Sequence, residues 1–396
     1  MKHVIAAIFL GLGAMCASAQ GLDELNLQIH GYATQGFVYT TQNNVFTMQS
    51  SQGSPAWTEA VVNLTARPNP KLRVGVQARY FLLGEFGNDI SIDWAMADYK
   101  ASDKLGFRFG KVKTPSGLFN ETQDIDPSYI WVLLPQAIYT ITSRTPELSH
   151  LGGVVYGAFP AGGDSGKVEY RFWGGEQVIP TGDGDFVNQK REGLGLNGPL
   201  MTPFFGGALH WRTPLPGLMV GASDSRYQSS SQGLANGGTE NFLPYNIEDY
   251  FAQYTHKKLM LAFELNRQAQ ETTISPAQSA AVAVDFIKRF SQSPAPAVSS
   301  RADDRDWYGM ATYKFNDKLS AGFYHMQGFD RQADLGPDRY TKDWTVTGRY
   351  DFNEFIYAKV EEHFIDGADL NYFEAQNRNG VKPDTRMTAI KLGVSF

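Results

Sequence analysis

The final segment of the chain, residues 386–396, alternates between two kinds of side chain and ends on an aromatic residue. Successive side chains of a β-strand point to opposite faces, so Ile390, Leu392, Val394 and Phe396 would share one face. Small or charged side chains occupy the other face. A soluble antiparallel sheet buries its apolar face in a core, whereas a closed sheet can turn that face to lipid and its polar face to water. The pattern therefore favours either a soluble β protein or a membrane-spanning β-barrel.

The same alternation recurs along the chain and predicts about sixteen strands. The expected strands are residues 25–40, 57–67, 71–83, 90–100, 105–111, 152–159, 168–173, 204–213, 218–227, 247–255, 259–268, 307–315, 319–328, 343–352, 355–364 and 386–396. The connections after even-numbered strands are short, and those after odd-numbered strands are long apart from 84–89. We therefore predict an all-β fold, a transmembrane antiparallel β-barrel with short periplasmic turns and long extracellular loops.

A soluble β-sandwich or propeller is the alternative fold. The chain shows no internal repeat of about 40–50 residues, which a propeller would have. The connections 112–151 and 269–306 are longer than a compact sandwich usually carries. Aromatic residues make up 13% of the chain, which suits two aromatic girdles at the membrane interfaces. These features favour the membrane barrel.

The first residues have the pattern of a secretory signal. A short polar start is followed by an apolar run, 4–12, and by small residues at 17–19. We expect a cleaved signal peptide at 1–19 and a single barrel domain at 20–396. Cys16, the only cysteine, leaves a lipid-anchored start as an alternative and excludes a disulfide from the mature chain.

Composition argues against several other functions. The net charge is −6 and no basic run occurs, so we expect no nucleic-acid partner. No histidine pair has metal-ligand spacing, and the glycine-rich segment 193–198 is followed by Pro199 rather than by a helix, so we expect no metal and no cofactor. Loose calcium binding remains open for two pairs of loop carboxylates, Asp183 with Asp185 and Asp366 with Asp369.

A family resemblance enters at residues 107–118, Phe-Arg-Phe-Gly-Lys-Val-Lys-Thr-Pro-Ser-Gly-Leu. This segment resembles the end of the fifth strand in Gram-negative outer-membrane porins of the phosphate-selective (O/P-type) trimeric group. The resemblance implies that the third outer loop, 112–151, folds into the lumen as a constriction loop. It also implies a homotrimer in the outer membrane through which small hydrophilic solutes diffuse passively. The pore of that group is strongly basic, whereas this chain mixes signs, so phosphate selectivity is not carried over.

Two long loops carry features of their own. The apolar stretch 130–134 within 112–151 is unusual for an outer loop. We expect it to pack against the inner wall, with contact to a neighbouring subunit as the alternative. In the outer loop 269–306, Ser275 precedes a proline, which predicts a short helix over 277–290.

Strand parity places many charged side chains on the lumen face, because a charge facing lipid costs about 2–4 kcal/mol at the bilayer midplane. The expected basic wall comprises Arg73, Arg79, Arg108, Lys111 and Lys113. The carboxylates expected to face it from the loop are Glu121, Asp124 and Asp126. Further basic residues expected in the pore lining are Arg171, Arg212 and Arg349. We predict a transverse field across a constriction, with arginines that lower the barrier for anionic solutes. The alternative is that these charges pair and solvate a water-filled interior.

Two other functions are alternatives to a porin. A barrel enzyme of the lipase or protease type needs a nucleophile and a base on its wall, and His210 has no obvious serine partner in the sequence. A structural or adhesive barrel would favour a filled bore, whereas about sixteen strands leave an open channel. We therefore expect a porin and not an enzyme. Its expected partners are outer-membrane lipid, lipopolysaccharide and small hydrophilic solutes.

Overall fold

The computed structural model describes residues 25–184, 187, 197–234, 237–275, 298–333, 336–369, 372 and 376–396. The expected signal peptide and the expected helix at 277–290 lie outside the described residues. Among the described residues, no helix is long and apolar enough to cross a membrane.

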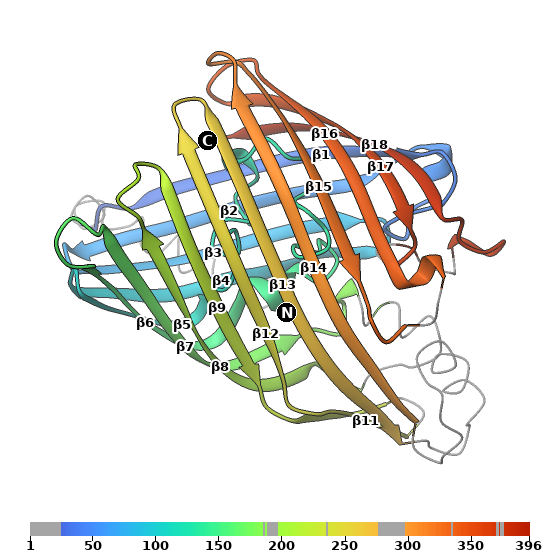
Figure 1. Ribbon diagram of the computed structural model, residues 1–396, viewed down its shortest axis with the longest axis horizontal. Helices are drawn as coiled ribbons and strands as arrows, with labels where there is room; N and C mark the ends of the chain where they lie inside the picture. Colours follow the sequence, from blue (N-terminus) through green and yellow to red (C-terminus); the bar gives the residue numbers. More distant parts are fainter. Residues whose placement is uncertain are drawn as a thin grey trace, which may run out of the picture.

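The described strands form one antiparallel sheet that closes on itself (Figure 1). They are β1 (Gln28–Thr40), β2 (Ser54–Asn69), β3 (Leu72–Leu83), β4 (Phe86–Ser102), β5 (Leu105–Lys113), β6 (Ser149–Pro160), β7 (Lys167–Ile179), β8 (Leu200–Arg212), β9 (Leu218–Tyr227), β10 (Ser230–Gly233), β11 (Thr239–Phe242), β12 (Tyr245–His256), β13 (Leu259–Ser275), β14 (Val298–Lys314), β15 (Leu319–Phe329), β16 (Tyr340–Asp351), β17 (Ile356–Gly367) and β18 (Asp384–Ser395). Short helices are η1 (Ser50–Gln52), η2 (Asp126–Ser128), α3 (Arg144–Leu148) and η3 (Pro337–Arg339). Sixteen strands make the barrel, while β10 and β11 form a small hairpin between β9 and β12.

The first and last strands close the ring. β1 pairs with β18 from Tyr32↔Ser395 to Thr40↔Met387. The backbone of Gly31 exchanges two hydrogen bonds of 3.0 Å with that of Phe396. The sheet of the barrel therefore has no free edge along these strands, which is what a spanning sheet in lipid requires.

The barrel wall is apolar outside and polar inside. On β18, the outward side chains of Ile390 and Leu392 are 45% and 52% exposed, whereas the inward Lys391 is 2% exposed. This inversion confirms the membrane-barrel prediction over the soluble sandwich. All sixteen expected strands are present in the expected order.

Several short turns contain an asparagine that accepts the same pair of hydrogen bonds. The side-chain oxygens of Asn69, Asn316 and Asn353 each accept hydrogen bonds from the backbone N–H groups two and three residues ahead, at 2.8–3.0 Å. Asparagine is favoured in such turns because its side chain replaces a backbone partner. These turns lie at the end of the barrel opposite the long loops.

The strands on the long-loop side extend further than expected. β13 and β14 stay paired as far as Ile274↔Val298, so the flanks of the expected loop 269–306 are strand. The segment Gln270–Thr273 is polar on both faces, so the alternation ends although the backbone pairing continues. In the same way β5 reaches Lys113 and β6 begins at Ser149, which shortens the expected loop 112–151 to 114–148.

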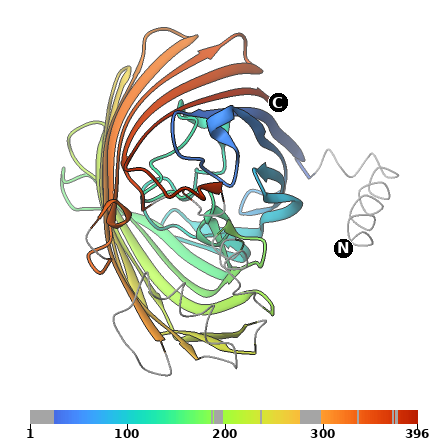
Figure 2. The same cartoon turned by 90° about the vertical axis from the view of Figure 1, so that its right-hand side faces the viewer.

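The third loop, residues 114–148, lies inside the ring of strands (Figure 2). Its apolar stretch is buried, as expected, against the inner wall. Trp131 packs with Tyr308, Tyr324 and Met326, which are carried by β14 and β15. On the opposite side of the stretch, Val132 and Leu133 join a cluster with Val45, Phe46, Trp57 and Leu83. The loop therefore fills the lumen next to β1–β3 and β14–β18.

Candidate functional site: the inner loop and the lumen

Asp126 of the inner loop sits in a buried ion cluster on one wall. Its carboxylate lies 2.9 Å from Nζ of Lys359 on β17 and 2.8 Å from Nζ of Lys391 on β18. It also accepts a hydrogen bond of 2.7 Å from the hydroxyl of Tyr357. Burial alone would raise the pKa of Asp126, but the two ammonium groups outweigh it and hold that pKa below its usual range. The cluster fixes the loop where β17 and β18 meet.

Side chains of the same wall form hydrogen bonds with backbone N–H and carbonyl groups of the loop. The carboxylate of Glu361 accepts hydrogen bonds from the N–H groups of Val132 at 2.7 Å and Leu133 at 3.0 Å. Nη1 of Arg349 donates to the carbonyl oxygen of Tyr129 at 2.9 Å. Buried backbone groups need such partners, and here charged wall residues provide them.

Glu264 on β13 ties together the beginning and the return of the loop. Its carboxylate accepts hydrogen bonds from the N–H of Leu118 at 2.8 Å and from the hydroxyls of Tyr139 and Tyr308, both at 2.7 Å. At Gly117, φ is +61°, and a Cβ there would lie 2.7 Å from a Glu264 oxygen. Only glycine fits this close approach without displacing the carboxylate.

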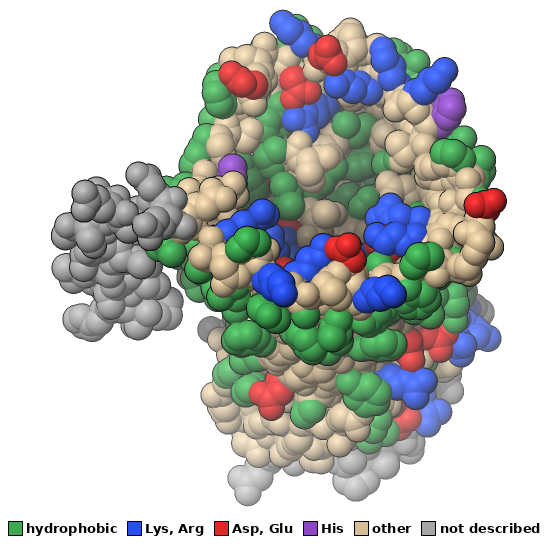
Figure 3. All heavy atoms as spheres, turned by 90° about the vertical axis from the view of Figure 1, so that its left-hand side faces the viewer, with side chains coloured by type: hydrophobic (Ala, Val, Ile, Leu, Met, Phe, Trp, Pro, Cys, Tyr) green, Lys and Arg blue, Asp and Glu red, His purple; other side chains and the backbone are tan. Residues whose placement is uncertain are grey.

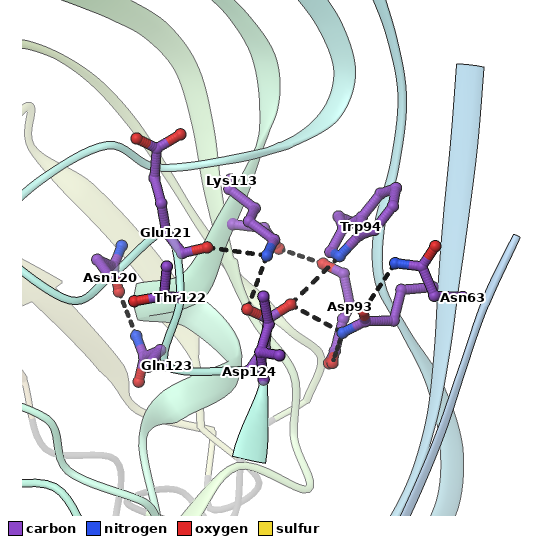
Figure 4. A network of polar contacts seen from close by, with 12 residues as sticks. Asn63, Asp93, Trp94, Lys113, Asn120, Glu121, Thr122, Gln123 and Asp124 are labelled. Carbon is purple, nitrogen blue, oxygen red and sulfur yellow. Dashed lines mark hydrogen bonds and ion pairs between the residues drawn. The ribbon is translucent and has the colours of Figure 1, made fainter. Parts of the chain in front are cut away.

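A second anchor joins the loop to β3, β4 and β5 (Figure 4). Nζ of Lys113 lies 2.7 Å from Oδ1 of Asp124. The other oxygen of Asp124 accepts hydrogen bonds from Nε2 of Gln77 at 2.9 Å and from Nε1 of Trp94 at 3.3 Å. Gln77 also donates to Oδ2 of Asp93 at 3.0 Å.

The helix α3 adds a buried arginine to this wall. Nη2 of Arg144 lies 2.9 Å from Oδ2 of Asp93, and Nη1 lies 3.4 Å from Oε1 of Glu59. Nε of Arg79 lies 2.6 Å from that same Glu59 oxygen. Burial would lower the pKa of Arg144, but the two carboxylates outweigh it and raise that pKa. Arg79 and Arg144 therefore form a buried ion-pair network with Glu59 and Asp93.

Arginines nearer the short turns also contact acidic partners directly. Nη1 of Arg108 lies 2.6 Å from Oε1 of Glu121, and Nε of Arg171 lies 3.2 Å from the other Glu121 oxygen. Nη2 of Arg73 lies 3.2 Å from Asp98, which is also 3.5 Å from Nε of Arg108. Burial would raise the pKa of Glu121, but Arg108 and Arg171 lower it.

The remaining predicted residues have similar partners. Nε of Arg212 lies 2.7 Å from Glu169, and Nζ of Lys111 donates to the carbonyl oxygen of Ile92 at 2.5 Å. The second guanidinium contact of Arg349 is Asp351, at 2.7 Å.

The predicted basic wall and loop carboxylates thus meet in contact rather than across an opening. Glu121 and Asp124 bind the expected wall, whereas Asp126 binds the opposite one. Two important residues were missed. Lys359 shares its strand face with Glu361, so parity marks it as inward. No local pattern marks Arg144, because its role depends on where the loop folds.

Two cavities border the lumen. The first, of about 370 Å³, lies between the inner loop and the wall formed by β9, β12, β13 and β14. Its charged lining consists of Glu147, Asp249, Asp304, Asp306 and Asp369. The second cavity, of about 610 Å³, lies near the short turns. Its charged lining consists of Lys100, Asp103, Lys104, Arg108, Lys167, Glu169 and Arg171. Figure 3 shows the end with the short turns as a hollowed mouth with lysine and arginine side chains around and inside it.

The described residues contain no group of three or more His, Cys, Asp or Glu side chains that could hold a metal ion. The carboxylates of the first cavity are therefore spread along its wall rather than gathered into a coordination sphere.

Comparison with known proteins identifies the fold. No family model matches the chain, and no curated protein matches its sequence. Among solved structures, OmpF of Salmonella typhi in complex with daunomycin matches with a TM-score of 0.58 at 16% identity, covering 94% of this chain and 98% of that one. An anion-selective porin from Comamonas acidovorans matches with a TM-score of 0.55 at 11% identity, covering 94% and 99%. The trimer form of OmpT, an outer membrane protein of Vibrio cholerae, matches with a TM-score of 0.50 at 11% identity, covering 94% and 99%. The chain therefore has the fold of outer-membrane porins.

Proposed function

We propose that this protein is an outer-membrane porin through which small hydrophilic solutes diffuse passively. The observation that carries the proposal is a closed ring of sixteen strands with an apolar outside and a charged inside. Such a wall is stable only with lipid outside and water within. The cavity beside the inner loop provides space for a solute on the lumen side of the wall.

The outer membrane of a Gram-negative bacterium is the location that fits this wall. The expected signal peptide at 1–19 would direct the chain to export. Outer-membrane lipid and lipopolysaccharide would cover the apolar band. The porin fold of the solved neighbours supports this location.

In this proposal the loop 112–151 is the constriction element. It crosses the lumen, and both its ends and its middle are bonded to the walls. Of the predicted pore residues, Arg108 and Arg171 line the mouth near the short turns. Lys113, Asp124 and Asp126 hold the loop in place, because each is buried or nearly buried in ion pairs. Arg79 acts through Glu59, which also contacts Arg144 of the loop.

A homotrimer is part of the proposal. It is supported by the resemblance of residues 107–118 to trimeric porins and by the trimer form of the Vibrio cholerae protein with this fold. Chemical crosslinking of the protein in its native membrane tests it, and a crosslinked ladder ending at three copies is expected. The O/P-type subgroup stays a prediction from sequence.

The alternative of a barrel enzyme gains no support at His210. Its ring packs edge-on against Phe251 with centroids 4.9 Å apart, and its Nε2 has no hydrogen-bond partner among the described residues. A general base needs its nucleophile within hydrogen-bond reach. Among the described residues, no hydroxyl or thiol is hydrogen-bonded to this ring nitrogen.

Liposome swelling tests the proposed function. Liposomes containing the folded protein are placed in isosmotic solutions of uncharged sugars of increasing size. We expect swelling that is fast for small sugars and falls steeply as the sugar approaches the width left by the loop. Swelling no faster than that of protein-free liposomes would contradict the proposal.

A further inference from the structure

Several arginines near the short turns lie against carboxylates. Arg73 and Arg108 share Asp98, and Arg108 and Arg171 share Glu121. Close pairing of opposite charges leaves little net field at a distance, particularly in salt solution. The attraction of anions by these arginines is therefore weak. The same holds for Arg212, whose guanidinium lies against Glu169.

The charged side chains that line the cavity beside the inner loop are acidic rather than basic. Among the described residues, its lining contains five carboxylates and no lysine, arginine or histidine. The rest of the lining is mostly hydroxyl and amide groups, including those of Thr114, Asn120, Ser225, Asn266 and Gln268. These groups can replace part of the hydration shell of a passing solute without adding positive charge.

Three of these carboxylates lack a basic partner. Within the described part of the chain, no lysine or arginine nitrogen lies within 4.0 Å of the carboxylates of Asp304, Asp306 or Asp369. Asp306 accepts one hydrogen bond, from the N–H of Phe329 at 3.3 Å. Asp249 is held by neutral groups, the hydroxyl of Ser223 at 2.8 Å and the amide of Asn266 at 2.7 Å. When these carboxyl groups are ionised, the uncompensated charge along this side of the lumen is therefore negative.

The spacing of the carboxylates determines what they can do. No three of them are close enough to coordinate a metal ion. A spread of negative charge over a wall of low dielectric raises the local concentration of cations without holding any one of them tightly. Conduction needs such weak, multiple interactions.

We propose that the passage between the inner loop and β9–β14 conducts cations in preference to anions, through the carboxylates of Asp304, Asp306 and Asp369. This inference rests on the proposed porin function and names the class of its solutes as small cations. It reverses the expectation of anion transport that the arginine-rich wall suggested. Hydrated alkali ions and small organic ammonium ions are the solutes that fit this lining.

The test is the zero-current potential across a planar bilayer that separates two concentrations of potassium chloride. The wild-type channel is expected to show the sign of a potassium preference. The triple variant Asp304→Asn/Asp306→Asn/Asp369→Asn keeps the size of the side chains and removes three charges. We expect its cation-to-anion permeability ratio to fall by about threefold or more at 0.1 M salt, where the Debye length is about 10 Å.

A matched control removes three charges from the short turns instead. Asp164, Asp317 and Glu354 are exposed at the tips of those turns. The variant Asp164→Asn/Asp317→Asn/Glu354→Gln is expected to keep the wild-type ratio. If the first triple variant fails to fold, the single variant Asp304→Asn is measured and a smaller fall in the same direction is expected.

Two results would overturn the inference. One is an anion preference in the wild-type channel. The other is a ratio that does not change in a folded Asp304, Asp306 and Asp369 variant, or that changes equally in the control. Absence of any conductance from correctly folded protein would instead contradict the proposed function, and the inference with it.

Discussion

Nζ of Lys391 on the last strand lies 2.8 Å from Oδ1 of Asp126 in the inner loop, although 265 positions separate the two residues in the chain. The contact joins the strand that closes the barrel to the segment that fills it. Lys359 binds the other oxygen of the same carboxylate at 2.9 Å. The position of the loop therefore depends on charges that the barrel wall brings together only after it has closed.

Asp126→Asn is expected to loosen the loop without unfolding the barrel. Removing one partner leaves two buried ammonium groups uncompensated, and breaking a buried pair in this way costs about 3–5 kcal/mol. Limited proteolysis in detergent would show cleavage within 114–148 that wild type resists. Asp317→Asn, in an exposed turn, provides the control. If the loop of the Asp126 variant were as resistant as in wild type, the anchoring role would be refuted.

Glu264→Ala is expected to destabilise the docked loop more than Glu264→Gln. The carboxylate accepts hydrogen bonds from Leu118, Tyr139 and Tyr308. Alanine would remove the acceptor of both tyrosine hydroxyls and leave the N–H of Leu118 with the Tyr139 hydroxyl alone. Each orphaned buried donor costs about 1–3 kcal/mol, whereas glutamine keeps one acceptor oxygen. The unfolding midpoint in guanidinium chloride measures the difference. Equal midpoints for the two variants would contradict this account.

Arg108→Ala is expected to increase the preference for cations. Its guanidinium lies 2.6 Å from Glu121, so its loss leaves Glu121 with only Arg171 among its ion-pair partners. The mouth near the short turns then gains net negative charge, and the zero-current potential should shift toward that of potassium. Lys318→Ala, in an exposed turn, is the control. An unchanged potential and conductance for Arg108→Ala would show that this arginine has no role in the pore.

Cation preference is expected to rise with pH near neutrality. Enclosure by the lumen wall and the nearby carboxylates of Asp330 and Asp338 raise the pKa of Asp369 to about 7. Asp304 and Asp306 of β14 line the same cavity. Below this pKa Asp369 is neutral, and above it the group adds a negative charge.

The measurement is the permeability ratio of wild type and Asp369→Asn between pH 5 and pH 9. The ratio of the wild type should increase over this range, and the variant should show a smaller increase. A ratio that falls as pH rises would contradict the assignment of Asp369 to the ion path.

The barrel could be predicted from the sequence alone because the alternating pattern of each strand can be recognised by itself. The alternation in 71–83 or 386–396 needs no knowledge of the partner strand, and each predicted strand is present. The strand ends on the long-loop side were missed where both faces are polar, as in Gln270–Thr273. The apolar stretch 130–134 correctly predicted burial against the wall, because apolar side chains inside a polar lumen need an apolar surface to pack on.

The charges of the lumen were harder to predict. Parity predicts Arg79 and Arg108 on the inner face, but it does not specify which carboxylate each one meets. Those distances depend on the path of the loop across the barrel. Arg144 has no pattern of its own. The proposed role of Asp304 depends on its having no ion-pair partner among the described residues, which only three-dimensional neighbours reveal.

The central claim, a water-filled bore inside an apolar wall, is tested most directly by single-channel recording in a planar bilayer. Folded wild-type protein should produce discrete upward current steps whose size increases with salt concentration. Smooth baseline current, from protein that is folded by circular dichroism and inserted in the bilayer, would contradict it.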